Sequence, residues 1–169
     1  PADFPIEWTV LPHMLEPAQA LNGSALIHPS RKGNILTTGF VGRGDPERAI
    51  AEAAFTVSGA VDTSYVEHAY IEPEAGHAFM DGDTLVIKAC TQAPYMDRDD
   101  TAAVLGLAPE KMRIVPTATG GGFGSKLDVS LQPLIGLVAL KTGRPAALAY
   151  TRNESMMSTT KRHPSEMKE

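Results

Sequence analysis

The chain has a single cysteine, Cys90, and therefore no partner for an internal disulfide. An all-cysteine metal cluster is excluded for the same reason, so an iron–sulfur centre would have to lie outside this chain. No apolar run approaches the roughly 18–20 residues of a membrane span, and the N-terminus lacks the basic and apolar regions of a signal peptide. We therefore expect a cytoplasmic protein that does not span a membrane.

Basic charge is also scarce. The formal net charge is −5, with 15 lysines and arginines against 20 acidic residues. Nucleic acid and anionic membranes bind basic surfaces, so neither is an expected partner. Hydrophobic content of 43% and charged content of 21% are typical of a globular protein. The chain begins with Pro rather than Met, and we expect it to be an excerpt of a longer protein.

The common phosphate-binding motifs are absent as well. A P-loop needs Gly-Lys-Ser/Thr, whereas here Ser125 precedes Lys126 and Leu127 follows it. The dinucleotide fingerprint finds only a degenerate match in Gly120, Gly122 and Ser125. A nucleotide-binding protein is therefore a weak interpretation of this sequence.

The stretch best suited to chemistry is residues 119–126, Thr-Gly-Gly-Gly-Phe-Gly-Ser-Lys. Four glycines in five positions leave the backbone uncovered by side chains, so a ligand can approach the N–H groups directly. An apolar helix is predicted over about 127–141, which would place these N–H groups in the positive field of a helix N-terminus. That arrangement favours an anionic oxygen, and Asp128 would cap or charge the helix start. A glycine-rich turn without a ligand is the alternative.

The hydrophobic patterns predict an α+β fold, with a mixed sheet, packed helices and an extended linker before them. A strand is expected at 6–11 and a short helix at 16–21, followed by a linker over 22–44. A helix capped by Asp45 should run to about residue 54, and a bent strand from 55 to 70. The remaining predicted elements are a hairpin of strands 76–80 and 84–90, helices at 96–105 and 107–110, a strand at 112–116, the buried helix at 127–141, a strand at 146–151 and a helix at 154–158.

Several polar side chains could carry chemistry. Gln92 ends a predicted strand, where its amide could hydrogen-bond an oxo group, although a polar strand end is the plainer interpretation. Cys90 is more consistent with a small buried residue than with a nucleophile, because no histidine or asparagine partner is evident.

Two clusters of ionisable residues are further candidates. The acidic set Glu67, His68, Glu72 and Glu74 is better explained by a solvated strand than by a metal site, because neighbouring strand residues point to opposite faces. The basic set Arg152, Lys161, Arg162 and His163 could face an anionic ligand or water.

Four ordered motifs resemble those of the molybdenum hydroxylases, the xanthine dehydrogenase and aldehyde oxidoreductase family. Residues 120–126 resemble the family's Gly-Gly-Gly-Phe-Gly-Gly-Lys signature, and residues 66–73 its Val-Glu-His-x-x-x-Glu-Pro segment. Residues 89–94 are similar to its Ser/Cys-Thr-Gln-x-Pro segment, and residues 151–164 to its Arg-x-Glu…Lys-Arg-His-Pro segment. The match is closest to bacterial nicotinate-dehydrogenase-like enzymes.

The resemblance implies a division of the chain and a set of roles. Residues 1–44 would end a preceding domain and form the linker, and residues 45–169 would be the N-terminal part of a molybdopterin-binding domain. Cofactor contacts are implied for Gln92, Gly122, Phe123 and Gly124; of these, Gln92 and Phe123 would contact molybdenum indirectly, through its oxygen ligands. Leu127 stands where the purine-oxidising enzymes have a substrate-binding Glu, so an aromatic heterocycle or an aldehyde suits this apolar wall better. The family's general-base Glu would lie downstream, so the chain alone is expected to be inactive.

The implied activity is hydroxylation of a substrate carbon with oxygen from water. The cofactor would be molybdenum-molybdopterin, with the cytosine dinucleotide form as one option. Iron–sulfur clusters and FAD would belong to other domains or subunits, which are the expected partners together with a small-molecule substrate. The competing hypothesis is a non-catalytic α+β module whose glycine-rich loop binds an anionic ligand or a partner chain. The resemblance further predicts that Gln92 converges on one cleft with Phe123 and Gly124.

Overall fold

The computed structural model describes residues 5–23 and 25–169 of the chain. Contacts group the chain into two compact units, one ending at Val57 and the other comprising Ser58–Glu169. The domain boundary predicted between residues 44 and 45 stays a prediction.

The first unit contains two short helices, α1 (Pro17–Leu21) and α2 (Pro46–Ala51). Both begin with proline in the first turn, where its missing N–H costs nothing. The side chain of Asp45 accepts a hydrogen bond from the amide of Arg48 at 3.0 Å, as predicted for an N-cap. The first helix is confirmed; the second ends at Ala51 rather than near residue 54.

The strand predicted at residues 6–11 is wrong. Residues 5–15 contain neither helix nor strand, and Trp8, Val10 and Leu11 are exposed. The alternation of apolar residues is real, but a strand also needs a partner for its backbone N–H and C=O groups. Among the described residues of 22–44 there is no helix or strand either, so the extended linker is confirmed.

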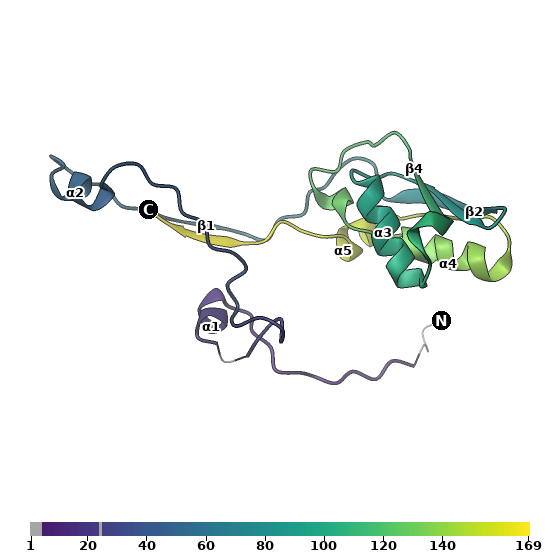
Figure 1. The fold of residues 1–169 in the computed structure, drawn as a ribbon, viewed down its shortest axis with the longest axis horizontal. Helices are drawn as coiled ribbons and strands as arrows, with labels where there is room; N and C mark the ends of the chain where they lie inside the picture. The colour runs from purple at the N-terminus through teal and green to yellow at the C-terminus, as the bar shows by residue number, and fades with distance from the viewer. Residues whose placement is uncertain (1–4, 24) are drawn as a thin grey trace. The chain divides into compact units, whose positions relative to one another are not determined.

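The larger sheet of the second unit has four strands: β2 (Ala75–Asp81), β3 (Thr84–Ala89), β4 (Met112–Pro116) and β5 (Ala146–Ala149). Their order is β4-β3-β2-β5, with β3 and β4 parallel and the other two pairs antiparallel. Figure 1 shows β2 and β4 of this sheet beside helices α3 (Pro94–Leu105) and α4 (Gln132–Thr142). The predicted hairpin is confirmed, because β2 and β3 are joined by a tight turn in which Gly82 has φ +62°. The predicted α+β class with a mixed sheet is confirmed as well.

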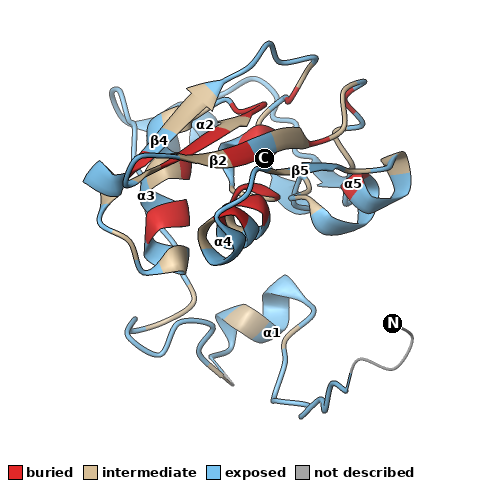
Figure 2. Cartoon of the chain, turned by 90° about the vertical axis from the view of Figure 1, so that its right-hand side faces the viewer, coloured by how far each residue is buried: buried red, intermediate tan, exposed pale blue. Residues whose placement is uncertain are grey.

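Helices α3 and α4 pack against one face of this sheet (Figure 2). Each is followed by a glycine in the left-handed conformation, Gly106 after α3 and Gly143 after α4. The apolar core lies between the helices and the sheet. Its buried members are Ala78, Leu85, Ile87, Ala89, Ala102, Met112, Leu131, Ile135 and Ala139.

Helix α4 differs from the prediction in its start and in its burial. It begins at Gln132, because Pro133 lacks an N–H and fits only the first turn of a helix. Its sheet-facing residues are buried, but three apolar residues on its other side are about half exposed: Leu134, Leu137 and Val138, at 52%, 45% and 49%. The expectation of a helix buried over much of its surface is therefore wrong within the described chain.

A second, two-stranded ribbon is formed by β1 (Ala60–Thr63) and β6 (Ser165–Lys168), all of whose residues are exposed. The bent strand predicted over 55–70 is thus reduced to its middle part. The other short elements are two 3-10 turns, η1 (Pro109–Lys111) and η2 (Ser125–Leu127), and helix α5 (Arg152–Ser158). In the part of the chain that the structure describes, no helix has the length and apolar character needed to cross a bilayer.

Candidate functional site

Three segments far apart in the sequence meet at residues 119–126, which we call the glycine loop. The loop follows β4 and lies against residues 70–74, which precede β2, and against Thr91 and Gln92, which follow β3. The amide of Gln92 donates to the carbonyl of Lys126 at 2.9 Å. Because β3 and β4 are parallel neighbours, Gln92 and the loop both emerge at the same end of the sheet.

Gln92 is oriented by the loop backbone. Its Oε1 accepts hydrogen bonds from the amides of Gly124 at 3.1 Å and Lys126 at 3.3 Å. The predicted proximity of Gln92 to the Phe123–Gly124 backbone is confirmed, whereas their convergence on one cleft stays a prediction. Because Oε1 is occupied by these two amides, the Nε2 group of this exposed residue is left as a hydrogen-bond donor.

Two glycines of the loop are required by neighbouring side chains. A Cβ at Gly122 would overlap Oε1 of Gln92, and a Cβ at Gly120 would lie 2.7 Å from Cβ of Glu72. Gly124 instead has φ +100° and open space around the position of a Cβ. The expectation of a loop uncovered by side chains therefore holds at Gly124 and fails at Gly120 and Gly122.

Phe123 is strained and exposed. Its φ is +55°, and it shares positive φ with only one other described non-glycine residue, Ala69, in the segment facing the loop. Such a conformation costs on the order of 1–3 kcal/mol and persists only where the surroundings impose it. The ring is 67% exposed, and within the described residues the amide of Phe123 has no hydrogen-bond acceptor in the protein.

An ion pair between the buried Lys126 and the partly exposed Glu72 also holds the loop. Nζ of Lys126 donates to Oε2 of Glu72 at 2.8 Å and to its carbonyl at 2.9 Å, and lies 4.6 Å from the centre of the Tyr70 ring. Oε2 of Glu72 also accepts from the amide of Gly120 at 2.7 Å. Burial raises the pKa of the Glu72 carboxyl, but the hydrogen bonds from Lys126 and Gly120 outweigh it, so the pKa lies below the ordinary value.

Sequence reasoning missed this pair as a unit. From the sequence, Glu72 is a candidate only as a metal ligand, and Lys126 only as a motif residue. A signal is nevertheless present, because one motif contains Glu72 and another contains Lys126, two residues of opposite charge. Their pairing follows only if both motifs are assumed to meet in space.

The predicted helix N-terminus at the loop is wrong. Residues 125–131 separate the last loop glycine from α4, and Leu131 rather than Asp128 is the N-cap. Asp128 is in extended conformation. The loop therefore does not lie at the N-terminus of α4, and two side chains, Glu72 and Gln92, accept hydrogen bonds from its amides.

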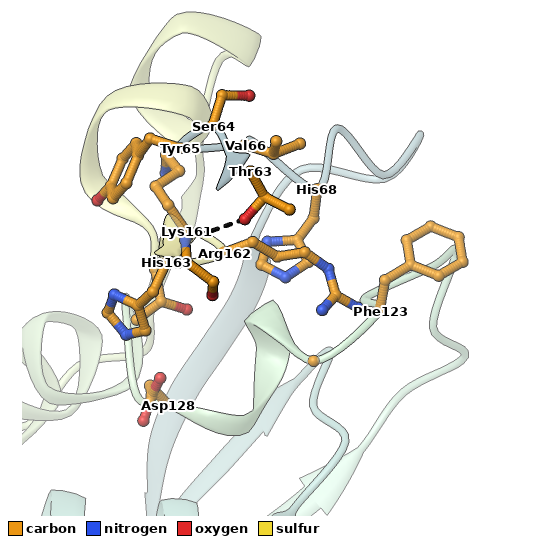
Figure 3. Close-up of a pocket in the computed structure, with 13 residues that line it drawn as sticks. Thr63, Ser64, Tyr65, Val66, His68, Phe123, Asp128, Lys161, Arg162 and His163 are labelled. Carbon is orange, nitrogen blue, oxygen red and sulfur yellow. Dashed lines mark hydrogen bonds between the residues drawn. The ribbon is translucent and has the colours of Figure 1, made fainter. Parts of the chain in front are cut away.

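A cavity of about 830 Å³ opens beside the exposed part of the loop (Figure 3). Phe123 and Gly124 line it together with residues of the 63–68 and 160–165 segments. Lys161, Arg162 and His163, three members of the predicted basic cluster, line it too, and Nζ of Lys161 lies 2.7 Å from Oε2 of Glu67. The fourth member, Arg152, instead donates to the carbonyl of Ile71.

The remaining candidates occupy other surroundings. Cys90 is buried, as predicted. Glu67, Glu72 and Glu74 are each engaged by a protein donor, namely Lys161, Lys126 and Tyr70. No cluster of three potential metal ligands occurs in residues 5–23 and 25–169. Leu127 lies in η2, is 40% exposed, and does not line the cavity beside Phe123.

Comparison with known proteins identifies the family. Residues 27–169 match the family model described as the molybdopterin cofactor-binding domain. The chain belongs to this family. The molybdenum hydroxylase resemblance drawn from the four motifs is therefore confirmed.

Similar proteins carry related names. The chain is 33% identical over 153 residues to the nicotinate dehydrogenase large molybdopterin subunit of Eubacterium barkeri, covering 90% of this chain and 34% of that protein. It is 31% identical over 161 residues to the xanthine dehydrogenase molybdenum-binding subunit of Escherichia coli O157:H7, covering 94% of this chain and 21% of that protein. The aldehyde oxidoreductase structure from Desulfovibrio desulfuricans matches with a TM-score of 0.76 and 27% identity, covering 92% of this chain and 18% of that one. This member of the family thus spans about a third or less of the length of these relatives.

Proposed function

We propose that this chain forms one wall of the molybdopterin site in an enzyme that hydroxylates a carbon of an aromatic heterocycle or an aldehyde, with oxygen taken from water. The observation that carries the proposal is the arrangement of Gln92, whose Oε1 is fixed by two loop amides while Nε2 is left to donate. The amide of Phe123, next along the loop, is a second donor without a protein acceptor among the described residues.

The residues present fit such a cofactor. Its oxygen ligands are acceptors, and the loop offers fixed donors beside the open face at Gly124. When bound, the molybdenum cofactor would supply the two-electron chemistry. Gln92 and the backbone of Phe123 would act as fixed dipoles that orient it, and Gly122 would allow Gln92 its close approach. Electrons would leave to iron–sulfur or flavin components in other segments or subunits.

Leu127 supports the choice of substrate class. A leucine side chain has no hydrogen-bonding group, so it cannot bind a purine as the glutamate of the purine-oxidising enzymes does. Leu127 directly follows the glycine loop, outside the cavity beside Phe123, and an apolar residue at this position suits an aromatic ring or an aldehyde better. The names of the relatives include nicotinate dehydrogenase and aldehyde oxidoreductase but also xanthine dehydrogenase, so Leu127 and not the names carries the choice of substrate class.

The competing hypothesis of an anion-binding module is not favoured. The amide of Gly120, one of the loop donors that an anion could use, already donates to the carboxylate of Glu72. No helix N-terminus lies at the loop to strengthen the binding of an anion, because α4 begins at Gln132.

The test uses two substitutions of Gln92 in the full-length enzyme. Gln92→Glu keeps an oxygen for the amides of Gly124 and Lys126 but loses the NH₂ donor, whereas Gln92→Ala loses both. If donation from Nε2 orients the cofactor, both variants should lower kcat about 100-fold with a smaller effect on KM.

The molybdenum content of each variant is measured as well, so that slower turnover can be distinguished from incomplete incorporation of the metal. Gln19→Ala, the same kind of change at a glutamine of α1, is the matched control and should leave kcat unchanged. An unaltered kcat in Gln92→Ala with normal metal content would contradict the proposal.

A further inference from the structure

Lys126 is a lysine in an unusual place. The residue is 4% exposed, and its side chain 2%. Lysines are almost never buried to this extent unless the charge is paired, because removal from water is costly. The three hydrogens of its ammonium group find the carboxylate and the carbonyl of Glu72 and the face of the Tyr70 ring.

The same residue connects both ends of the glycine loop. Through its backbone, Lys126 donates to Oε1 of Gln92 and accepts from the amide of Gln92. Through its side chain it binds Glu72, whose carboxylate in turn holds the amide of Gly120. The strained residue Phe123 lies between these two attachments.

We propose that Lys126 is a positioning residue: with Glu72 it holds the glycine loop in the conformation that presents the Phe123 amide and the Gln92 side chain to the cofactor. This inference rests on the proposed function. Positive φ at a bulky residue persists only when the surroundings impose it, and the two attachments are what impose it here. Lys126 does not itself bind the cofactor, because its buried ammonium group has no free hydrogen to donate to a ligand.

The decisive variant is Lys126→Met in the full-length enzyme with its partner subunits. Methionine is about as long as lysine and apolar, so it fills the buried space but leaves the carboxylate of Glu72 without its cation. We expect bound molybdenum and pterin per protein to fall about 10- to 100-fold, the usual cost of removing a supporting residue from a metal site. Amides of residues 120–126 should also exchange hydrogen faster in the cofactor-free protein.

The double variant Lys126→Met/Glu72→Gln removes both charges while keeping an oxygen for the amide of Gly120. It should therefore bind more cofactor than Lys126→Met alone. Ile135→Ala serves as the control for stability, because it opens a cavity under α4 without touching the loop. It should lower the thermal midpoint while its folded fraction keeps its molybdenum.

Two outcomes separate the inference from the proposed function. Wild-type enzyme that carries no molybdenum or pterin would overturn the proposed function. Wild-type enzyme with normal loading, together with Lys126→Met that keeps full loading and unchanged loop exchange, would overturn the positioning role alone.

If Lys126→Met does not fold, the variants Glu72→Gln and Glu72→Ala test the positioning role instead. The positioning role requires cofactor content to decrease from wild type to Glu72→Gln to Glu72→Ala, because only the last loses the acceptor for Gly120. Equal content in all three would overturn it.

Discussion

The glycine loop follows β4, and helix α4 packs on β2 and β3 of the same sheet. The loop and the helix are held in place by different forces. Ile135 and Ala139 of α4 pack on Leu85 and Ile87 of β3, and all four are at most 3% exposed. The loop has polar attachments: a carboxylate, a carboxamide and a buried ammonium group. Apolar packing is non-directional and mainly sets stability, whereas hydrogen bonds are directional and set the position of individual atoms.

Two buried or partly buried carboxyl groups show the same contrast. Asp97, on α3, is fully buried and accepts from Nε2 of Gln132 at 2.8 Å. Burial raises its pKa more than the hydrogen bonds from Thr91 and Gln132 lower it. The pKa of Glu72 moves in the opposite direction, because Lys126 and the Gly120 amide stabilise its charge. The core region thus disfavours a charge, and the loop depends on one.

The largest expected effect belongs to the core. Ile135→Ala should lower the free energy of local opening of α4 and β3 by about 2–5 kcal/mol, because it removes buried methyl groups and leaves a cavity. Native-state hydrogen exchange of these amides in the full-length enzyme measures it. Equal loosening of residues 120–126 would break the distinction between the two regions.

Gly122→Ala should come next, with a cost of about 1–3 kcal/mol, because the new Cβ must displace the side chain of Gln92. The predicted loss of kcat should approach that of Gln92→Ala, while exchange at α4 stays unchanged. Gly59→Ala is the matched control, since a Cβ there meets open space and its φ is not in the left-handed region. A Gly122→Ala enzyme as fast as wild type would show that Gln92 does not need its observed position.

The smallest effect is the dependence on pH. The pKa of Glu72 is lowered from 4.5, so its contribution to stability is complete above that pH and is lost as the pH falls through the folded-state value. The pKa of Asp97 is raised from 3.8, so its protonated form stabilises the fold at low pH and this contribution is lost as the pH rises through the folded-state value.

Acidification below about pH 4.5 should therefore loosen the loop, whereas protonation of Asp97 should stabilise α3. Hydrogen exchange corrected for intrinsic rates measures both regions in one sample, and Glu72→Gln and Asp97→Asn should each flatten the pH dependence of their own region. Loop and helix that loosen together, with no change in Glu72→Gln, would contradict the assignment.

Local sequence patterns correctly predict the elements that depend on interactions between residues close together in the sequence. The hairpin β2–β3 follows from alternating residues and a turn with glycine, and α2 begins where Asp45 and Pro46 predict it. The prediction of a strand at 6–11 fails because its pattern needs a partner strand that the described residues do not supply. The predicted start of α4 fails because the apolar pattern extends on both sides of Pro133, whose missing N–H overrides it.

By itself the sequence supplied the candidate residues, because the motifs contain Gln92, the glycine loop, Glu72 and Lys126. Only the tertiary structure decided how they work together. The burial of Lys126, its pairing with Glu72 and the fixing of Oε1 of Gln92 depend on contacts between residues 34 and 54 positions apart in the chain. Such contacts form only when β3 and β4 pair and bring the segments after them to one end of the sheet, and no local pattern encodes that meeting.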